Sequence, residues 1–179
     1  ILSVDAGNVG EMAPFASNVA AVIIPTNHRE GYFPKKAEER VSFLEENITR
    51  ARRMGIERII GDLILDPMSI AESLVAFREF SERNPDIPLF LGVGNVAELM
   101  DADSVGVNAL LASIASEMGA GLLLTTERSA KTRGSIKEVS TASKMMFLAK
   151  KRGSLPKDLG LDLLIPVFAE ESRERGLGV

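Results

Sequence analysis

The sequence predicts an α/β fold in which strands and helices alternate along the chain. Five short apolar runs each end in a polar residue, and successive run ends fall 22 to 39 residues apart. Continuous apolar runs are typical of parallel strands buried on both faces, and this spacing leaves room for a helix between two strands. Such alternation implies a parallel sheet. The run ends are Asp5, Asn27, Asp66, Asn95 and Thr126.

The first two strand–helix units occupy residues 1 to 55. Ile1–Asp5 is expected to form a strand, followed by a short helix within Gly7–Asn18. Ala20–Ile24 is a second apolar, β-branched run, and a long helix is expected from about Lys35 to Met54. Gly55 is expected to end that helix. Its apolar residues recur at helical spacing: Val41, Leu44, Ile48 and Met54.

The third and fourth units follow the same plan. Ile59–Leu65 is expected to be a strand, and Ser69 with Glu72 three residues later has the spacing of a capping box at the start of a helix. A fourth strand is expected within Pro88–Asn95. The remaining predicted elements are a helix at Ser104–Met118, a strand at Leu122–Leu124 and a helix from about Ser135 to Lys150.

This repeat favours a TIM-type (β/α) barrel or a large part of one. A complete eight-unit barrel needs about 250 residues, so residues 1–153 would form its C-terminal five or six units. Residues 154–179 would form an extension with a charged tail and one more strand at Leu161–Val167. A doubly wound open sheet is the alternative that the same pattern allows.

The composition describes a globular protein and argues against several classes of function. The chain has 179 residues, 45% of them hydrophobic, and a net charge of −4 that argues against a nucleic-acid partner. It has no cysteine, which excludes disulfides and thiol chemistry. Because no signal peptide or membrane-length apolar run is seen, a cytoplasmic protein without a membrane partner is expected. The initial Ile1 suggests a piece of a longer polypeptide.

The stretch from Pro88 to Arg128 is the centre of the predicted site. Its first strand breaks into Gly92-Val-Gly-Asn95, at the carboxyl end where ligands bind in parallel α/β folds. Glycine lets the backbone approach a ligand closely, and the Asn95 amide offers both a donor and an acceptor. Asn95 as a plain turn residue is an equal alternative.

A basic loop after the last predicted strand is a candidate anion site. Arg128, Lys131 and Arg133 precede a helix whose N-terminal N–H groups would be free near Ser135. These groups and Thr126 could hold the anionic end of a substrate. A solvated basic loop is the alternative.

Three other polar residues invite both functional and structural explanations. Asp62 falls inside an apolar strand, where it would either face a ligand or pair with a base such as Arg58. Asp5 and Asp66 follow strands and could simply cap helices. His28 is the only histidine, which excludes a histidine metal cluster, and a surface-loop role is expected for it.

The ordered strand ends Ser-Val-Asp5, Leu-Asp66-Pro67 and Gly92-Val-Gly-Asn95 resemble those of the pterin-binding barrel family. That family includes dihydropteroate synthases and pterin-dependent methyltransferases. The resemblance extends from Ile1 to about Leu148, and the segment from Gly92 to Ser135 is most similar to archaeal dihydropteroate synthase-like proteins linked to methanopterin synthesis.

The resemblance implies that Asp5 and Asp66 contact the aminopyrimidine edge of a pterin and that Asn95 hydrogen-bonds its ring. A carboxylate suits that edge because it accepts two parallel hydrogen bonds. The sequence departs from the dihydropteroate synthases at several positions. It lacks their Ser-Arg-Lys after the fourth strand and their Arg-x-His after the last, it has Met68 in place of a glycine, and Asn27 lies two places late for their second asparagine.

The resemblance implies a transferase that condenses a dihydropterin-methyl diphosphate with an arylamine, in folate or methanopterin synthesis. A non-catalytic pterin-binding module and a pterin-dependent methyltransferase domain remain as alternatives. The pterin would be substrate or ligand, no cofactor would be covalently bound, no protein metal ligands are assigned, and a Mg²⁺ requirement stays open. The chain would form a homo-oligomer or be completed by a missing N-terminal segment.

Overall fold

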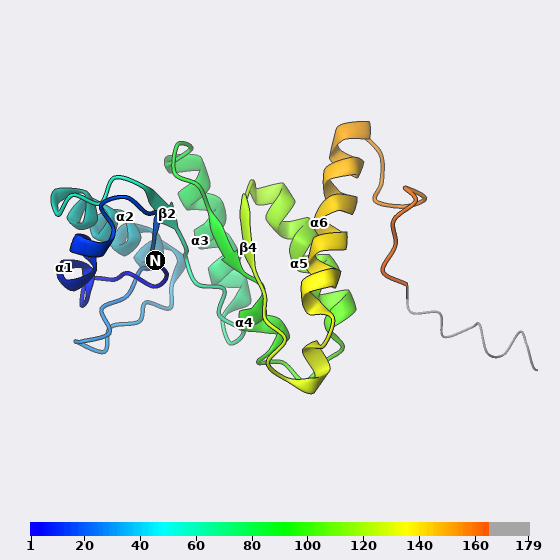
Figure 1. Cartoon of the computed structure of the whole chain (residues 1–179), viewed down its shortest axis with the longest axis horizontal. Helices are drawn as coiled ribbons and strands as arrows, with labels where there is room; N and C mark the ends of the chain where they lie inside the picture. Colours follow the sequence, from blue (N-terminus) through cyan, green and yellow to red (C-terminus); the bar gives the residue numbers. More distant parts are fainter. Residues whose placement is uncertain (165–179) are drawn as a thin grey trace, which may run out of the picture.

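The computed structural model describes residues 1–164 and confirms an α/β fold (Figure 1). The strands are β1 (Ala21–Ile23), β2 (Ile59–Gly61), β3 (Phe90–Gly92) and β4 (Leu122–Leu124). The α-helices are α1 (Val9–Met12), α2 (Ala37–Arg53), α3 (Ile70–Arg83), α4 (Gly94–Ala97), α5 (Ser104–Met118) and α6 (Ser135–Arg152). Two 3₁₀ helices, η1 (Ala13–Phe15) and η2 (Ala130–Thr132), complete the set.

All strand pairing in residues 1–164 that links these four strands is parallel and follows chain order. β1 pairs with β2, and β3 pairs with β4. Single parallel bridges join Val4 to Ile23 of β1 and Gly61 of β2 to Leu89 beside β3. A doubly wound sheet reverses its strand order at a switch point. The part of the chain that the structure describes shows no such reversal.

The strands are shorter than the apolar runs that predict them. β2 ends at Gly61 because Asp62 starts a turn in which its Oδ1 accepts a hydrogen bond from the Ile64 N–H, at 2.8 Å. Ile64 then adopts a φ of +61°, which a strand cannot contain. The predicted extra strand is wrong for Leu161–Leu164, which have no regular structure, and its last three positions lie outside the described residues.

The helix ends agree with the sequence only in part. Gly55 follows the end of α2 with a φ of +85°, the left-handed conformation expected of a glycine stop. The capping box at Ser69 is wrong: Glu72 turns outward and accepts a hydrogen bond from the Ala37 N–H at the start of α2, at 2.8 Å. This bond ties the first turn of α3 to the first turn of α2.

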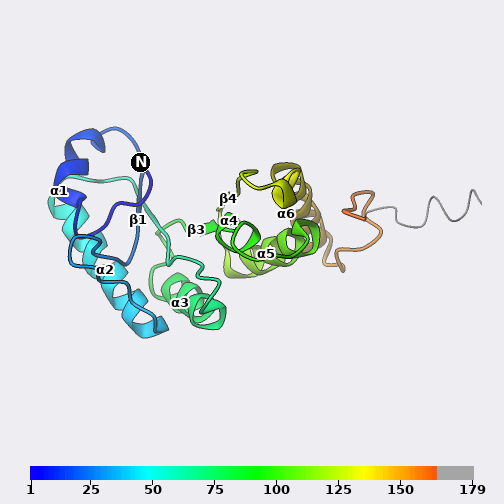
Figure 2. The same ribbon diagram turned by 90° about the horizontal axis from the view of Figure 1, so that it is seen from below.

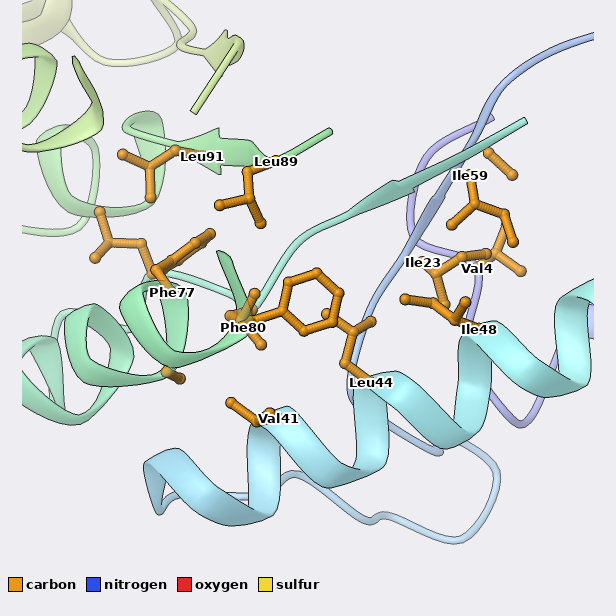
Figure 3. Close-up of a cluster of buried hydrophobic side chains, with 14 of the residues drawn as sticks. Val4, Ile23, Val41, Leu44, Ile48, Ile59, Phe77, Phe80, Leu89 and Leu91 are labelled. Atoms are coloured by element: carbon orange, nitrogen blue, oxygen red, sulfur yellow. The ribbon is translucent and has the colours of Figure 1, made fainter. Parts of the chain in front are cut away.

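The helices cover one face of the curved sheet. In Figure 2 the strands follow an arc, and α2, α3 and α5 lie along its outer side. Helix α2 packs against α3, and α5 packs against α6. Alternate strand residues point to these helices, and Figure 3 shows Phe77 and Phe80 of α3 beside Leu89 and Leu91, with Leu44 of α2 next to Phe80.

The opposite, concave face is apolar, and within residues 1–164 it is left exposed at its β4 edge. It carries the other alternate positions of the strands, and its edge residues Leu122 and Leu124 are 41% and 39% exposed. Parallel sheets normally have both faces buried. A cavity of about 200 Å³ on this face is lined by the strand residues Val22, Phe90 and Leu124 and by the adjoining residues Leu2, Ile24 and Ile64.

Phe80 is the side chain whose removal tests this core most directly. It is fully buried, and its ring fills the space above Gly61, where an added Cβ would lie 3.1 Å from it. Phe80→Ala is therefore expected to lower the free energy of unfolding by about 3–5 kcal/mol. Phe15→Ala is the matched control, since Phe15 is 72% exposed and should change stability by less than about 0.5 kcal/mol. Urea unfolding of both variants measures the difference, and equal losses would contradict this description of the core.

Candidate functional site

The parallel pairing brings the polar run ends to one end of the sheet. The loops after Val4 and after the four strands all leave the sheet at its carboxyl end, the lower side in Figure 1. The polar residues there separate into four groups: those around Asp5, those around Asp66, the cavity that contains Asp62 and Asn95, and the loop after β4. Each group has its own hydrogen-bond pattern, and these patterns decide which residues are available to a ligand.

Asp5 holds together the loop that follows Val4 and the loop that follows β1. It is 2% exposed, and it accepts hydrogen bonds from the Gly7 and His28 N–H groups and from the Thr26 hydroxyl, at 2.8 to 2.9 Å. The His28 Nδ1 lies 2.8 Å from its Oδ1. Burial works to raise the pKa of Asp5, but these hydrogen bonds from His28, Thr26 and Gly7 hold it below its ordinary value. Both oxygens of Asp5 are therefore occupied by protein groups.

Asp66 is also engaged by the protein. It accepts hydrogen bonds from the Met68 N–H and the Ser69 hydroxyl at 2.9 Å, and Lys35 Nζ lies 3.1 Å away. The Met68 N–H is the main cause that lowers the pKa of Asp66 to about 2, with Lys35 and Ser69 adding to it against partial burial. Arg40 lies 3.5 Å away on the inner side. Asp66 is thus an ionised carboxylate inside an ion-pair and turn network.

Arg40 fixes the chain between β2 and α3. Its guanidinium is almost fully buried and donates to the carbonyl oxygens of Leu63 and Ile64 and to the hydroxyls of Ser69 and Ser73. Burial lowers the pKa of Arg40 from its ordinary value, while Asp66 and Glu72 oppose that shift. These donor bonds fix the backbone carbonyls of the turn that begins at Asp62.

Asp62 is the acidic residue that lines the cavity on the concave face. It is 7% exposed, and the cavity has a volume of about 200 Å³. One oxygen accepts the Ile64 N–H, and no other hydrogen bond to this carboxyl is present within residues 1–164. Burial raises the pKa of Asp62 to about 7, against the Ile64 hydrogen bond and the charge of Arg40. A cavity carboxyl with a raised pKa is a functional-site candidate on physical grounds.

Asn95 lies across the same cavity from a neighbouring part of the sheet. Its amide rests over Gly92, where an added Cβ would come within 3.0 Å of Nδ2, so only glycine leaves room for this placement. Within residues 1–164 the Asn95 amide has no hydrogen-bond partner, and it lines the cavity with Asp62 and Gly92. Of the predicted contacts, these three residues are the ones that the structure brings together in a single cavity.

The backbone around this cavity is strained. Ile64 and Ser3 both line it, and both have positive φ angles, +61° and +57°. A positive φ is a genuine outlier for a β-branched residue such as isoleucine, and it costs on the order of 1–3 kcal/mol. Strain of this kind persists only where the surroundings impose it, here through the Arg40 and Asp62 hydrogen bonds to residue 64.

The loop after β4 forms an anion-binding arrangement that a protein carboxylate already occupies. Glu98 accepts hydrogen bonds from the Thr126 and Thr132 hydroxyls and from the Arg128 and Ser129 N–H groups, at 2.8 to 3.2 Å. Partial burial works to raise the pKa of Glu98, but these bonds lower it to about 2. The predicted anion preference of this loop is therefore met by Glu98.

The basic residues of that loop have different surroundings. Lys131 binds Asp101, at 3.0 Å, and the Met100 carbonyl. Arg128 and Arg133 form no ion pair within the described part of the chain. The start of α6 is occupied as well, since the Ile136 N–H donates to Glu127 at 3.1 Å. The two arginines are thus the cations of this loop that a bound anion could engage without displacing a carboxylate.

Asn27 is buried beside the Asp5 group rather than in the cavity. Its backbone pairs with Tyr32 across a tight loop, and its Oδ1 has no hydrogen-bond partner in the structure. The sequence pattern did not indicate the roles of His28, Arg40 and Glu98. Their signals were weak because each acts through a residue distant in the chain: Asp5, the turn at 62–66, and the loop at 126–132.

Two further observations bear on the class of site. Within residues 1–164, no group of three or more histidine, aspartate or glutamate side chains is arranged to hold a metal ion. In the same part of the chain, every helix is too short or too polar to cross a membrane.

The raised pKa of Asp62 predicts how stability depends on pH. The folded chain holds the Asp62 proton up to about pH 7, whereas the unfolded chain releases it near 3.8. Between these values the folded state binds more protons, so the free energy of unfolding falls as pH rises from about 4 to 7. Asp62→Asn should remove this decline, which is on the order of a few kcal/mol. Denaturant titrations from pH 4 to 8 compare the two proteins, and parallel curves would show that Asp62 titrates normally.

Comparison with known proteins identifies one relative without assigning a function. No protein-family model matches the chain. Over 171 residues the chain is 55% identical to an uncharacterized protein of Methanocaldococcus jannaschii, MJ0107. The match covers 92% of this chain and 32% of the relative, so the chain spans about a third of the length of the curated relative it matches. The chain is therefore similar to one part of a longer archaeal protein.

Proposed function

We propose that this chain is part of a pterin-binding (β/α) barrel and acts as a dihydropteroate synthase-like transferase domain. The observation that carries the proposal is the cavity at the carboxyl end of the sheet, where Asp62 and Asn95 face the same space across Gly92. The ordered strand-end motifs supply the pterin resemblance. The all-parallel pairing in chain order supports the barrel, because each strand of a (β/α) barrel pairs with its neighbours in the chain.

The exposed β4 edge of the concave face supports the view that further strand–helix units complete the barrel. Four strands and the segment at Val4 form an arc rather than a closed cylinder, and their inner side chains remain apolar. Barrel interiors are filled by side chains of all strands, mainly branched aliphatic ones. The relative is about three times as long as the part that this chain matches, which leaves ample length for the missing units.

The contacts in the site favour a division of roles among the carboxylates. One oxygen of Asp62 is free, and the other accepts only the Ile64 N–H and keeps a second lone pair. The carboxylate would therefore accept hydrogen bonds from a ring N–H and an exocyclic amine, while the Asn95 amide would pair with the adjacent ring edge. Asp5 and Asp66, which the resemblance assigns to the pterin, have their oxygens occupied by protein donors. They would position the loops around the ligand.

The reaction would depend on positioning and charge stabilisation. An arylamine nitrogen attacks the methylene carbon of the pterin as the bond to diphosphate breaks, so negative charge grows on the departing diphosphate. Arg128 and Arg133, which form no ion pair within residues 1–164, are the groups that would stabilise it. A Mg²⁺ ion could be brought by the diphosphate itself.

A pterin-dependent methyltransferase domain is the second candidate. The position of Asn95 in the cavity favours it, because the resemblance to the methyltransferases rests on this asparagine and the Ser-Arg-Lys of the synthases is absent. Turnover that depends on a corrinoid would assign the chain to this class. Turnover of pterin diphosphate with an arylamine would assign it to the first, and pterin binding without either reaction would identify a non-catalytic module.

Asp62→Asn tests the pterin contact. The change replaces an acceptor by a donor that faces a donor, and a charge-assisted hydrogen bond is worth roughly 1.5–3 kcal/mol, so affinity should fall ten- to a hundredfold. Binding by the wild type should also strengthen as pH rises through about 7, because only the ionised Asp62 accepts both bonds. Pterin fluorescence titrations of the longest polypeptide that carries this sequence measure both effects.

Asp66→Asn is the matched control for that titration. Asp66 already accepts bonds from Met68 and Ser69, so its amide variant should bind plain pterin within about threefold of the wild type. A large loss for Asp66→Asn together with none for Asp62→Asn would return the pterin contact to Asp66.

The barrel proposal has its own test. The 179-residue chain alone should self-associate and bind a hydrophobic fluorescent dye through its concave face, whereas the longer polypeptide should do neither. Leu124→Asp should abolish most of the dye signal, because Leu124 lines the concave cavity. Leu110→Asp on the outer surface of α5, where Leu110 is 62% exposed, is the control. Equal loss in both variants would show that the dye binds elsewhere.

A further inference from the structure

The pair formed by Asp5 and His28 has the geometry of a histidine activated by a buried carboxylate. Asp5 is 2% exposed, whereas the His28 side chain is 49% exposed, so the pair reaches from the interior to the surface. The His28 Nδ1 lies 2.8 Å from Asp5 Oδ1, and the His28 N–H donates to the other oxygen at 2.8 Å. These two contacts hold His28 through both its backbone and its ring.

The carboxylate sets which ring nitrogen carries the proton. Gly7, Thr26 and the His28 N–H all donate to Asp5, and these hydrogen bonds lower its pKa, so Asp5 is ionised at neutral pH. An ionised carboxylate can only accept, and Nδ1 must therefore carry a hydrogen. In the neutral ring the lone pair is then on Nε2, which has no hydrogen-bond partner within residues 1–164.

One side of the His28 ring packs against the backbone of Gly7. A Cβ added at Gly7 would lie 2.9 Å from the His28 Nδ1 and 3.0 Å from the Asn27 Oδ1, so the ring packs directly on the glycine backbone. Asn47 of α2 stabilises the same loop, because its Nδ2 donates to the carbonyl oxygens of Ile24 and Thr26. The ring is thus held by packing as well as by the hydrogen bond.

The pair and the proposed pterin cavity are both at the carboxyl end of the sheet, and paired strands connect them. His28 follows β1 and Asp62 follows β2, and these strands are paired, with the Asp62 N–H donating to the Ile23 carbonyl at 3.0 Å. Thr26, which donates to Asp5, lines a small cavity with Ile64, and Ile64 also lines the cavity of Asp62. A substrate that fills the cavity and extends over the loop after β1 would meet His28.

We propose that Asp5 and His28 form a general-base dyad that accepts a proton from an amine nucleophile. The identity of the nucleophile rests on the proposed function, whereas the dyad itself does not. In the step, the amine nitrogen bonds to the methylene carbon while the carbon–oxygen bond to diphosphate breaks and its electron pair leaves with the diphosphate. One N–H proton of the amine passes to Nε2 of His28, and Asp5 stabilises the imidazolium that results.

The single histidine of the chain allows a direct test of the dyad. Because His28 is the only imidazole, nitrogen NMR of the ¹⁵N-labelled chain reports it without assignment. The wild type should show Nδ1 protonated and Nε2 unprotonated in the neutral ring. Asp5→Asn should lose this preference, while Asp66→Asn should retain it. Predominant Nε2 protonation in the folded wild type would overturn the proposal.

Turnover separates proton transfer from a structural role. His28→Gln should lower kcat about 10²- to 10⁴-fold, the usual contribution of a general base, and leave the pterin Kd within about twofold. Arg29→Gln is the control beside it, since Arg29 pairs only with the exposed Glu11 within the described residues. Equal kcat values for both variants would rule out the base. If no pterin binds at all, the proposed function fails, and the nitrogen spectrum still decides the dyad.

Discussion

The fold depends on burying one face of a parallel sheet under helices. Phe77 and Phe80 of α3 and Leu44 of α2 pack against the strand residues that point outward, and this contact sets the arc in which β1 to β4 are arranged. The same contact leaves the alternate residues on the concave side, where they form an apolar surface around Asp62. A carboxyl in such surroundings loses hydration, and the chemistry of the site follows from that loss.

The fold was predictable where local pattern and burial agree. Apolar runs located all four strands, three of which have buried core positions within the run, whereas the run at Ile1–Asp5 forms only a single bridge at Val4. Gly55 ended its helix as its left-handed conformation requires. The strand lengths were not predictable, because Asp62 and Ile64 form a turn within an apolar run. Ser69 is the N-cap of α3 as expected, but the capping box was wrong for a similar reason: Glu72 makes its bond to α2, to a partner 35 residues away.

The position of the candidate site in the fold was predictable, but the hydrogen-bond partners of its residues were not. Run ends located Asp5, Asp66 and Asn95 at one end of the sheet, and Asp62 stood out as a charge inside the run that ends at Asp66. The pattern carries no information on which carboxylate oxygens protein donors occupy. The side-chain contacts distinguish Asp62, with a free oxygen, from Asp5 and Asp66, whose oxygens are bound. His28 was expected in a surface loop, and its side chain is half exposed. Its contact with Asp5 was not predicted, because Asp5 lies 23 positions earlier in the chain.

The hydrogen bonds of Glu98 couple the segment that follows β3 to the segment that follows β4. Glu98 directly follows α4, and it holds residues 126 to 132, which lie beyond β4. Gly94 also approaches the backbone of Thr125 and Thr126 so closely that an added Cβ would lie 3.4 Å from it. Hydrogen bonds and close packing thus join the segments after β3 and β4, so we expect them to move together. Opening this side of the cavity is consequently a motion of one body that includes Asn95.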